Sequence, residues 1–270
     1  MERPMVNGAR SMRSTVSKGT DRVMLMNADR VLYYGLLGTR SVSIQGSLTV
    51  YVAFAQPFLI RIDQGPWQET RCKAVPPYVP HQITSPERMI GILNIEPEFV
   101  DCGALPWLGC TADRGNAIDS LAERIRSLYA RLTQEGSHDV AWPFDLDEAM
   151  FGGPLPLRRF DPRIESTVAR IKANPCDQFS AEDCASDLGL SFSRFLHLFS
   201  DEVGTTFRRF RAWKRARSLL QYVNRSVSLT DIALEVGYTD SSHFSHSIRQ
   251  VYGLKPKDIF AGSRRLAVLA

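Results

Sequence analysis

The sequence predicts a two-domain α+β protein, with an N-terminal antiparallel β barrel or sandwich followed by a domain built only of helices. Three observations predict this fold class. Short apolar runs rich in β-branched and aromatic residues, separated by Gly and Pro, fill the first 150 residues. From residue 161 onward, apolar residues recur at steps of three and four. Between these parts, the stretch FGGPLPLRRFDP holds two glycines and three prolines, which interrupt helices and strands alike.

These boundaries divide the chain into four parts: a flexible N-terminal segment (1–22), a β domain (23–150), a linker (151–160) and a helical domain (161–262). The β domain has five predicted strand segments: RVLYYGLL, SLTVYVAF, PFLIRID, ETRCKAV and MIGILNIE. The sequence DQGPW, at 63–67, is expected to form a hairpin turn.

Composition limits the function classes. The 270 residues can bury two cores of ordinary size. No apolar run approaches the length that crosses a bilayer, and the first residues lack the apolar middle of a signal peptide, so we expect a soluble, cytoplasmic protein with no membrane partner. The five cysteines form no C-x-x-C pair, which indicates neither a disulfide framework nor a thiolate zinc site.

Charge separates the two halves more clearly than the total of +4 indicates. Residues 158–270 hold 18 Lys and Arg against 12 Asp and Glu, whereas residues 1–157 hold 15 against 17. A basic half joined to a mildly acidic one predicts that the basic half meets a polyanion.

A long amphipathic helix is predicted between residues 117 and 135. Its apolar residues fall at steps of three and four. Two partners are possible for this stripe, namely its own β domain or the same helix of a second subunit. We favour the second and therefore predict a homodimer with the dimerisation residues Leu121, Ile125, Leu128 and Leu132.

The helical domain begins with clear local signals. Asp161 and Pro162 form an N-cap and a first-turn proline, and the helix they start should stop at Asn174. Ser180, followed three residues later by Asp183, predicts a capping box that opens the next helix.

The helical domain also contains a weak internal duplication. Ala185 and Gly189 match Ala233 and Gly237 at an offset of 48, while further pairs (Phe195 with Phe244, Phe199 with Ile248, and Gly204 with Gly253) match at 49. Each copy reads as a short helix, a glycine that permits a left-handed turn, and a second helix, which is the pattern of a helix-turn-helix.

The second helix of each copy carries small polar side chains away from its apolar face. Short hydroxyls and imidazoles reach base edges without keeping the helix out of the major groove. We therefore predict DNA base contacts in the first copy by Ser193, Arg194 and His197, and in the second by Ser241, Ser242, His243, Ser245 and His246.

A basic helix is predicted between the copies, in the sequence TTFRRFRAWKRARSLLQY (205–222). It would act as a rod that places two readers in successive major grooves, about 34 Å apart. The residues expected to contact phosphate on this rod and near the C-terminus are Arg208, Arg209, Lys214, Arg215, Arg249 and Lys255.

With these motifs, residues 161–260 resemble the DNA-binding domain of AraC/XylS-type transcription regulators, most closely in the run SLTDIALEVGYTDSSHFSHSIRQVYGLKP. The resemblance implies a sequence-specific, effector-responsive regulator in the bacterial nucleoid, with double-stranded DNA and RNA polymerase as partners. It adds Leu196 to the base-facing residues. Because this side chain is apolar, two roles are open for the first copy: contact with a thymine methyl, or mainly positioning the protein on DNA. Ala212 departs from the family, which commonly has arginine at that position.

The N-terminal half resembles, more faintly, the cupin-like sensor domain of the same regulators, through VPPYVPHQI at 75–83. The resemblance implies a small-molecule effector of unknown identity. A metal needs three or four ligands, and this half has only His81 and His138 as histidines, so we expect no metal or cofactor. Candidate ligand-binding residues are Tyr33, Tyr51, Trp67, Tyr78 and His81. Two alternatives remain open, a metal-dependent cupin enzyme with a DNA-binding appendage, and a regulator whose N-terminal half only dimerises or docks another protein.

Overall fold

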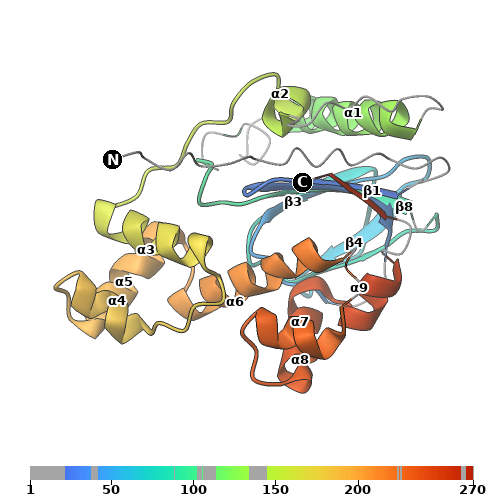
Figure 1. Cartoon of the computed structure of the whole chain (residues 1–270). Coiled ribbons are helices and arrows are strands. Elements are labelled where there is room, and N and C mark those ends of the chain that lie inside the picture. The colour runs from blue at the N-terminus through green and yellow to red at the C-terminus, as the bar shows by residue number, and fades with distance from the viewer. Residues whose placement is uncertain are drawn as a thin grey trace, which may run out of the picture.

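A computed structural model describes residues 22–37, 42–87, 89–101, 105, 114–133, 145–223, 225, 227–262 and 266–269. Figure 1 shows an N-terminal part made of β-sheets and a C-terminal part made of helices. The predicted flexible segment lies outside the described residues up to residue 21, and Arg22 already belongs to the first strand.

Six strands form the larger sheet, in the order β6-β3-β8-β2-β1-β9. They are β1 (Arg22–Met26), β2 (Arg30–Leu36), β3 (Leu48–Val52), β6 (Cys72–Val75), β8 (Met89–Ile95) and β9 (Leu266–Leu269). Neighbouring strands are antiparallel except for β9, which pairs parallel to β1. The strand nearest the C-terminus is therefore part of the N-terminal sheet.

A smaller sheet has the order β5-β4-β7 and contains β4 (Phe58–Ile62), β5 (Gln68–Thr70) and β7 (His81–Thr84). The predicted turn at 63–67 joins β4 to β5, and Asp63 adopts a left-handed φ of 50° there. The predicted segment ETRCKAV holds two strands, β5 and β6, which belong to different sheets. Strands β1, β7 and β9 were not predicted, and each has only four or five residues.

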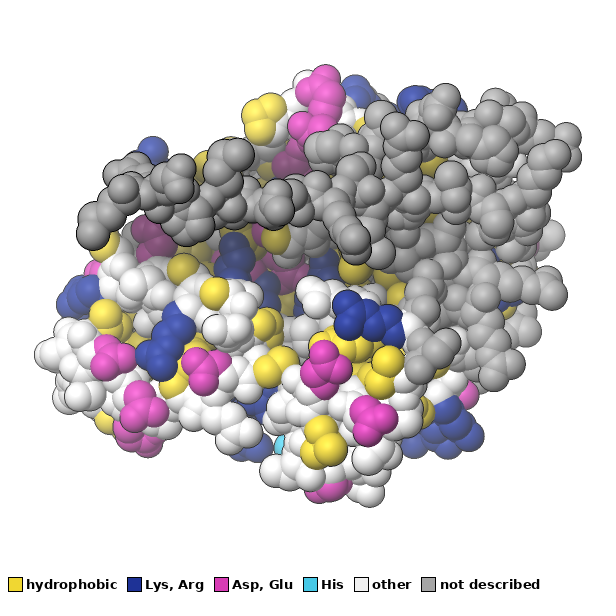
Figure 2. Space-filling model, in the orientation of Figure 1, with side chains coloured by type: hydrophobic (Ala, Val, Ile, Leu, Met, Phe, Trp, Pro, Cys, Tyr) yellow, Lys and Arg dark blue, Asp and Glu magenta, His cyan; other side chains and the backbone are white. Residues whose placement is uncertain are grey.

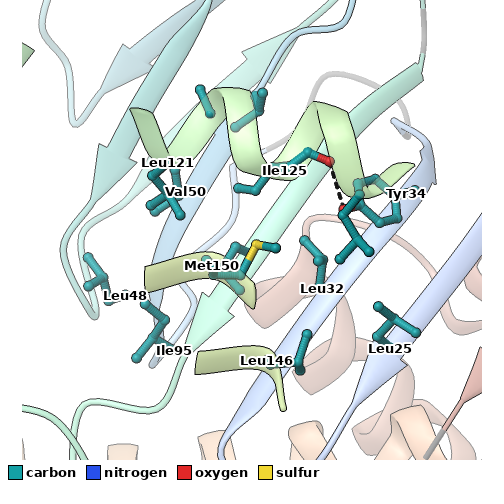
Figure 3. Packing of buried hydrophobic residues seen from close by; sticks show 14 of the residues in the cluster. Leu25, Leu32, Tyr34, Leu48, Val50, Ile95, Leu121, Ile125, Leu146 and Met150 are labelled. Atoms are coloured by element: carbon teal, nitrogen blue, oxygen red, sulfur yellow. Dashed lines mark hydrogen bonds between the residues drawn. The ribbon is translucent and has the colours of Figure 1, made fainter. Parts of the chain in front are cut away.

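The long helix α1 (Arg114–Thr133) covers the larger sheet, together with α2 (Leu146–Phe151) (Figures 1 and 3). The hydroxyl of Tyr34 on β2 donates a hydrogen bond of 2.8 Å to the carbonyl of Ile125 on α1. Arg30 binds Asp147 through Nε and Nη2, at 2.8 and 3.0 Å, and so fixes α2 to β2.

The four residues predicted to mediate dimerisation do not have that role in this structure. They lie in the core of their own β domain, with exposed fractions of 3%, 0%, 4% and 3% for Leu121, Ile125, Leu128 and Leu132. Their apolar area is already removed from water by the sheet, which is the main reason an amphipathic helix pairs with anything.

The helical domain contains α3 (Pro162–Ala173), α4 (Ala181–Asp187), α5 (Phe192–Val203), α6 (Phe207–Ser218), the 3₁₀ helix η2 (Leu219–Tyr222), α7 (Leu229–Glu235), α8 (Ser241–Tyr252) and α9 (Pro256–Gly262). Two apolar cores hold it together. One joins α3, α4, α5 and the start of α6, and the other joins the end of α6 to α7 and α8. In Figure 1, α6 runs between the two helix groups.

Local signals set these helix ends as expected. Asp161 caps α3, and Ser180 and Asp183 form the complete capping box at α4. The basic helix is shorter than its predicted range, because the backbone tightens into η2 after Ser218.

Candidate nucleic-acid interface

The turns of the two helix pairs share a left-handed glycine and one backbone hydrogen bond, although the second turn is one residue longer. Gly189 and Gly237 both adopt the left-handed conformation, with φ of 63° and 77°. The residue after each glycine donates its amide to the carbonyl of the small alanine, Ala185 or Ala233, at 2.9 Å in both copies. The duplication seen in sequence is therefore present in the folded chain.

The second helix of each pair is capped in the same way. Ser191 accepts the Arg194 amide at 3.3 Å to start α5, and Asp240 accepts the His243 amide at 2.7 Å to start α8. Both helices end at a left-handed glycine. Their inner faces are buried, as predicted, by Phe195, Phe199, Phe244 and Ile248.

The predicted base-contacting residues lie on the outer faces of these two helices. On α5, Ser193, Arg194 and His197 are exposed and Leu196 is half-buried. On α8 the exposed residues are Ser241, Ser242, His243 and His246, and Ser245 is half-buried. The fold thus brings each predicted set onto the surface of one helix.

Four predicted phosphate contacts are exposed, namely Arg208, Arg209, Arg249 and Lys255. Arg215 is half-buried, and its guanidinium lies 5.4 Å from the ring centre of Tyr238. Figure 2 shows the two helical lobes separated by a hollow, with Lys and Arg side chains between them.

Lys214 does not fit its predicted role in this structure. Its side chain is 6% exposed, and its ammonium donates to the carboxylates of Glu96 and Glu98 in the β domain. Burial alone would lower the pKa of Lys214, but the two glutamates hold that pKa above its ordinary value. An ammonium enclosed in this way cannot reach a phosphate.

Glu96 lies at the centre of the contact between the domains. Its carboxylate accepts the indole Nε1 of Trp213 at 2.7 Å, and Arg217 Nε lies 3.4 Å from its other oxygen. Burial would raise the pKa of Glu96, but Lys214 and Arg217 outweigh burial and lower it. For Glu98, burial prevails and raises the pKa. Sequence reasoning missed both glutamates, because nothing near them in the chain marks a partner more than 100 residues away.

Two of the candidate ligand residues come together inside the β domain. The Tyr51 hydroxyl lies 2.7 Å from His81 Nε2, and Ser43 Oγ lies 3.1 Å from the same nitrogen. His81 Nδ1 lies 2.9 Å from the Val79 carbonyl and therefore carries the proton, so Nε2 accepts. Burial lowers the pKa of His81 and favours this neutral form.

The other three candidates do not join this pair. Tyr33 donates to the Leu36 carbonyl and packs with the β1 methionines, and the Trp67 ring lies under Arg61. Tyr78 packs against the core of the second helix pair and lies under Arg209.

Neither a metal site nor a membrane span is found in the part of the chain that the structure describes. Within these residues, no three His, Cys, Asp or Glu side chains are grouped so that they could hold a metal ion. No described helix is both long enough and apolar enough to cross a membrane.

Comparisons with known proteins give a family model and similar sequences. A family model described as a helix-turn-helix domain matches residues 184–262. The transcriptional activator RhrA of Rhizobium meliloti is 34% identical over 112 residues, which cover 40% of this chain and 34% of RhrA. The HTH-type transcriptional activator RhaS of Klebsiella pneumoniae is 30% identical over 156 residues, covering 53% of this chain and 55% of RhaS.

A solved structure extends the likeness to most of the chain, at the level of fold alone. The structure of ToxT from Vibrio cholerae matches with a TM-score of 0.54 and 9% identity, covering 86% of this chain and 98% of ToxT. By sequence, the chain spans between about a third and about half the length of the curated relatives described above.

Proposed function

We propose that this chain is a sequence-specific DNA-binding transcription regulator of the AraC type, because residues 184–262 match a helix-turn-helix family model and the similar proteins are transcriptional activators. One observation carries the proposal. Two helix pairs share the same glycine turn and the same kind of N-cap, and each presents an exposed polar face on its second helix. Two such units on one domain are the geometry for reading two stretches of major groove.

We propose that the two faces read DNA differently. The α8 face offers the Ser242 hydroxyl and the His243 imidazole, which can hydrogen-bond to base edges. The α5 face combines His197 with half-buried Leu196, which suits a thymine methyl. Exposed Arg208 and Arg249 would contact phosphates, which positions the protein without reading sequence.

The β domain is proposed to sense a small molecule or to contact another protein. Support for a filled interior comes from Tyr51 and His81, which are 2% exposed and satisfied by each other and by Ser43. This contact favours the alternative in which the N-terminal half docks a partner without binding a ligand at this cluster. A cupin-like barrel, a homodimer, a contact with RNA polymerase and a cytoplasmic location stay predictions.

The direct test is selection of binding sites from a random double-stranded DNA pool, followed by gel shifts with the selected site and a scrambled one. We expect a preferred sequence and binding that weakens with salt. The double variant Ser242→Ala, His243→Ala should lose discrimination, whereas Arg208→Ala should weaken binding to both duplexes alike. Ser166→Ala, on the exposed surface of α3, is the matched control.

Equal binding to all sequences would overturn the sequence-specific part of the proposal. Metal analysis of the purified protein separates the enzyme alternative, since a stoichiometric metal ion would support it. Sedimentation equilibrium measures whether the chain forms a homodimer.

A further inference from the structure

A buried group of charged side chains holds helix α6 against the β domain. We call this group the α6 joint and define it as Glu96, Glu98, Lys214 and Arg217. The side chains of the two glutamates are 1% exposed, that of Lys214 is 6% exposed and that of Arg217 is 10% exposed. All four therefore lie almost entirely out of water, at a contact between the two domains.

The acidic residues of the α6 joint come from the β domain, and the basic residues come from helix α6. Glu96 directly follows β8 and Glu98 comes two residues later, and β8 pairs with both β2 and β3 inside the larger sheet. Lys214 and Arg217 lie on α6, whose apolar residues belong to the cores of both helix pairs. The joint thus connects the central strand of one domain to the central helix of the other.

Further contacts close around the charges. Arg217 Nη2 donates to the Asn27 carbonyl at 3.0 Å, and the amide of Ile44 donates to the Val251 carbonyl of α8 at 3.1 Å. Gly46 lies so close to Trp213 that a Cβ there would be 2.3 Å from the indole Cγ. The second helix pair is therefore packed on the β domain together with α6.

Such a joint is expected to be either closed or fully opened to water. Separating the domains by a small distance would leave two carboxylates and two cations buried without their partners, which is strongly unfavourable. Because these charged groups must be exposed together, the strand β8 and the helix α6 that hold them are expected to open in one cooperative step.

We propose that the α6 joint couples the β domain to the DNA-binding helices, so that occupancy of one domain changes the stability of the other. Lys214 is then a positioning residue of the interdomain contact rather than a phosphate contact. This inference rests on the proposed function, because it names the route by which the β domain regulates DNA binding.

Hydrogen exchange of the full-length chain, with and without a DNA duplex, tests the coupling. A ligand that binds only the native state slows exchange at every amide that opens by the same cooperative unfolding, by about 100-fold when its concentration is one hundred times Kd. We expect DNA to slow the slowest amides of β8 as well as those of α5 and α8. In the variant Glu96→Gln, Glu98→Gln, DNA should slow only the helical amides.

The matched control is Glu69→Gln, Glu148→Gln, which removes the same charge from two exposed positions of the β domain. This control should behave like the wild type. A merely structural role of the joint would speed exchange in both domains of the variant yet leave the DNA effect on β8 in place, and that result would overturn the proposal. Unchanged β8 exchange in wild type with DNA bound would overturn it as well.

If Glu96→Gln, Glu98→Gln does not fold, the single variant Glu98→Gln is used, since it leaves Glu96 to accept from Lys214 and Trp213. It should show a smaller DNA effect on β8 than wild type, and an equal effect contradicts the coupling. If DNA does not slow amide exchange in α5 and α8 of the wild type, the proposed function is rejected instead. In that case the slowest β8 and helical amides, measured without DNA, should still exchange together in the wild type and separately in the variant.

Discussion

Replacing Gly46 by Ala is expected to destabilise the contact between the domains. The added Cβ would lie 2.3 Å from Cγ and 2.6 Å from Cδ1 of Trp213, far inside van der Waals contact. The indole is 2% exposed and donates to Glu96 at 2.7 Å, so it cannot move away freely. Overpacking costs about 1–3 kcal/mol and a weakened hydrogen bond to a charged group adds to it, so we expect a loss of about 2–4 kcal/mol.

Urea unfolding followed by circular dichroism measures this loss as a free energy of unfolding. The same substitution is then made in a Trp213→Ala background, where the clashing atoms are gone. There it should cost less than about 1 kcal/mol, because the penalty of Gly46→Ala depends on the ring. An equal loss in both backgrounds would refute the reasoning, since the cost would then arise in the Gly46 backbone and not from the close approach of Trp213.

Three further predictions concern the β domain and the helix caps. Ile125→Ala should lower the free energy of unfolding by about 2–5 kcal/mol, since removing a fully buried side chain leaves a cavity. An unfolding midpoint that depends on protein concentration in the wild type but not in the variant would instead indicate that Ile125 contacts a second subunit. Burial lowers the pKa of His81, so as pH falls the unfolded chain protonates this imidazole at a higher pH than the folded chain does. The free energy of unfolding should therefore decrease as pH drops through about 6.5. Urea titrations at several pH values should show a weaker pH dependence for His81→Gln. Ser191→Ala and Asp240→Ala should each cost about 1 kcal/mol in thermal unfolding by removing an N-cap, and no change for either would mean that its cap is dispensable.

Local chemistry in the sequence determined the helices and turns of the DNA-binding half. A serine or aspartate that caps a helix acts on amides two or three residues away, and Gly189 and Gly237 are read directly as left-handed turns because other residues rarely adopt that conformation. The duplication therefore predicted both the two helix pairs and the exposed polar faces of α5 and α8. The apolar face of α6 was also predictable from its spacing.

Tertiary structure alone decided what each face meets. The apolar stripe of α1 is compatible with a second subunit as well as with its own sheet. The hydrophobic effect has no direction, and the spacing of apolar residues does not identify the partner. Lys214 looked like one more cation of a basic helix, yet the fold places it against Glu96 and Glu98, more than 100 residues earlier in the chain. Pairing of buried charges across domains depends on how close two distant segments of the chain lie in the folded protein. No local pattern in the sequence gives that separation.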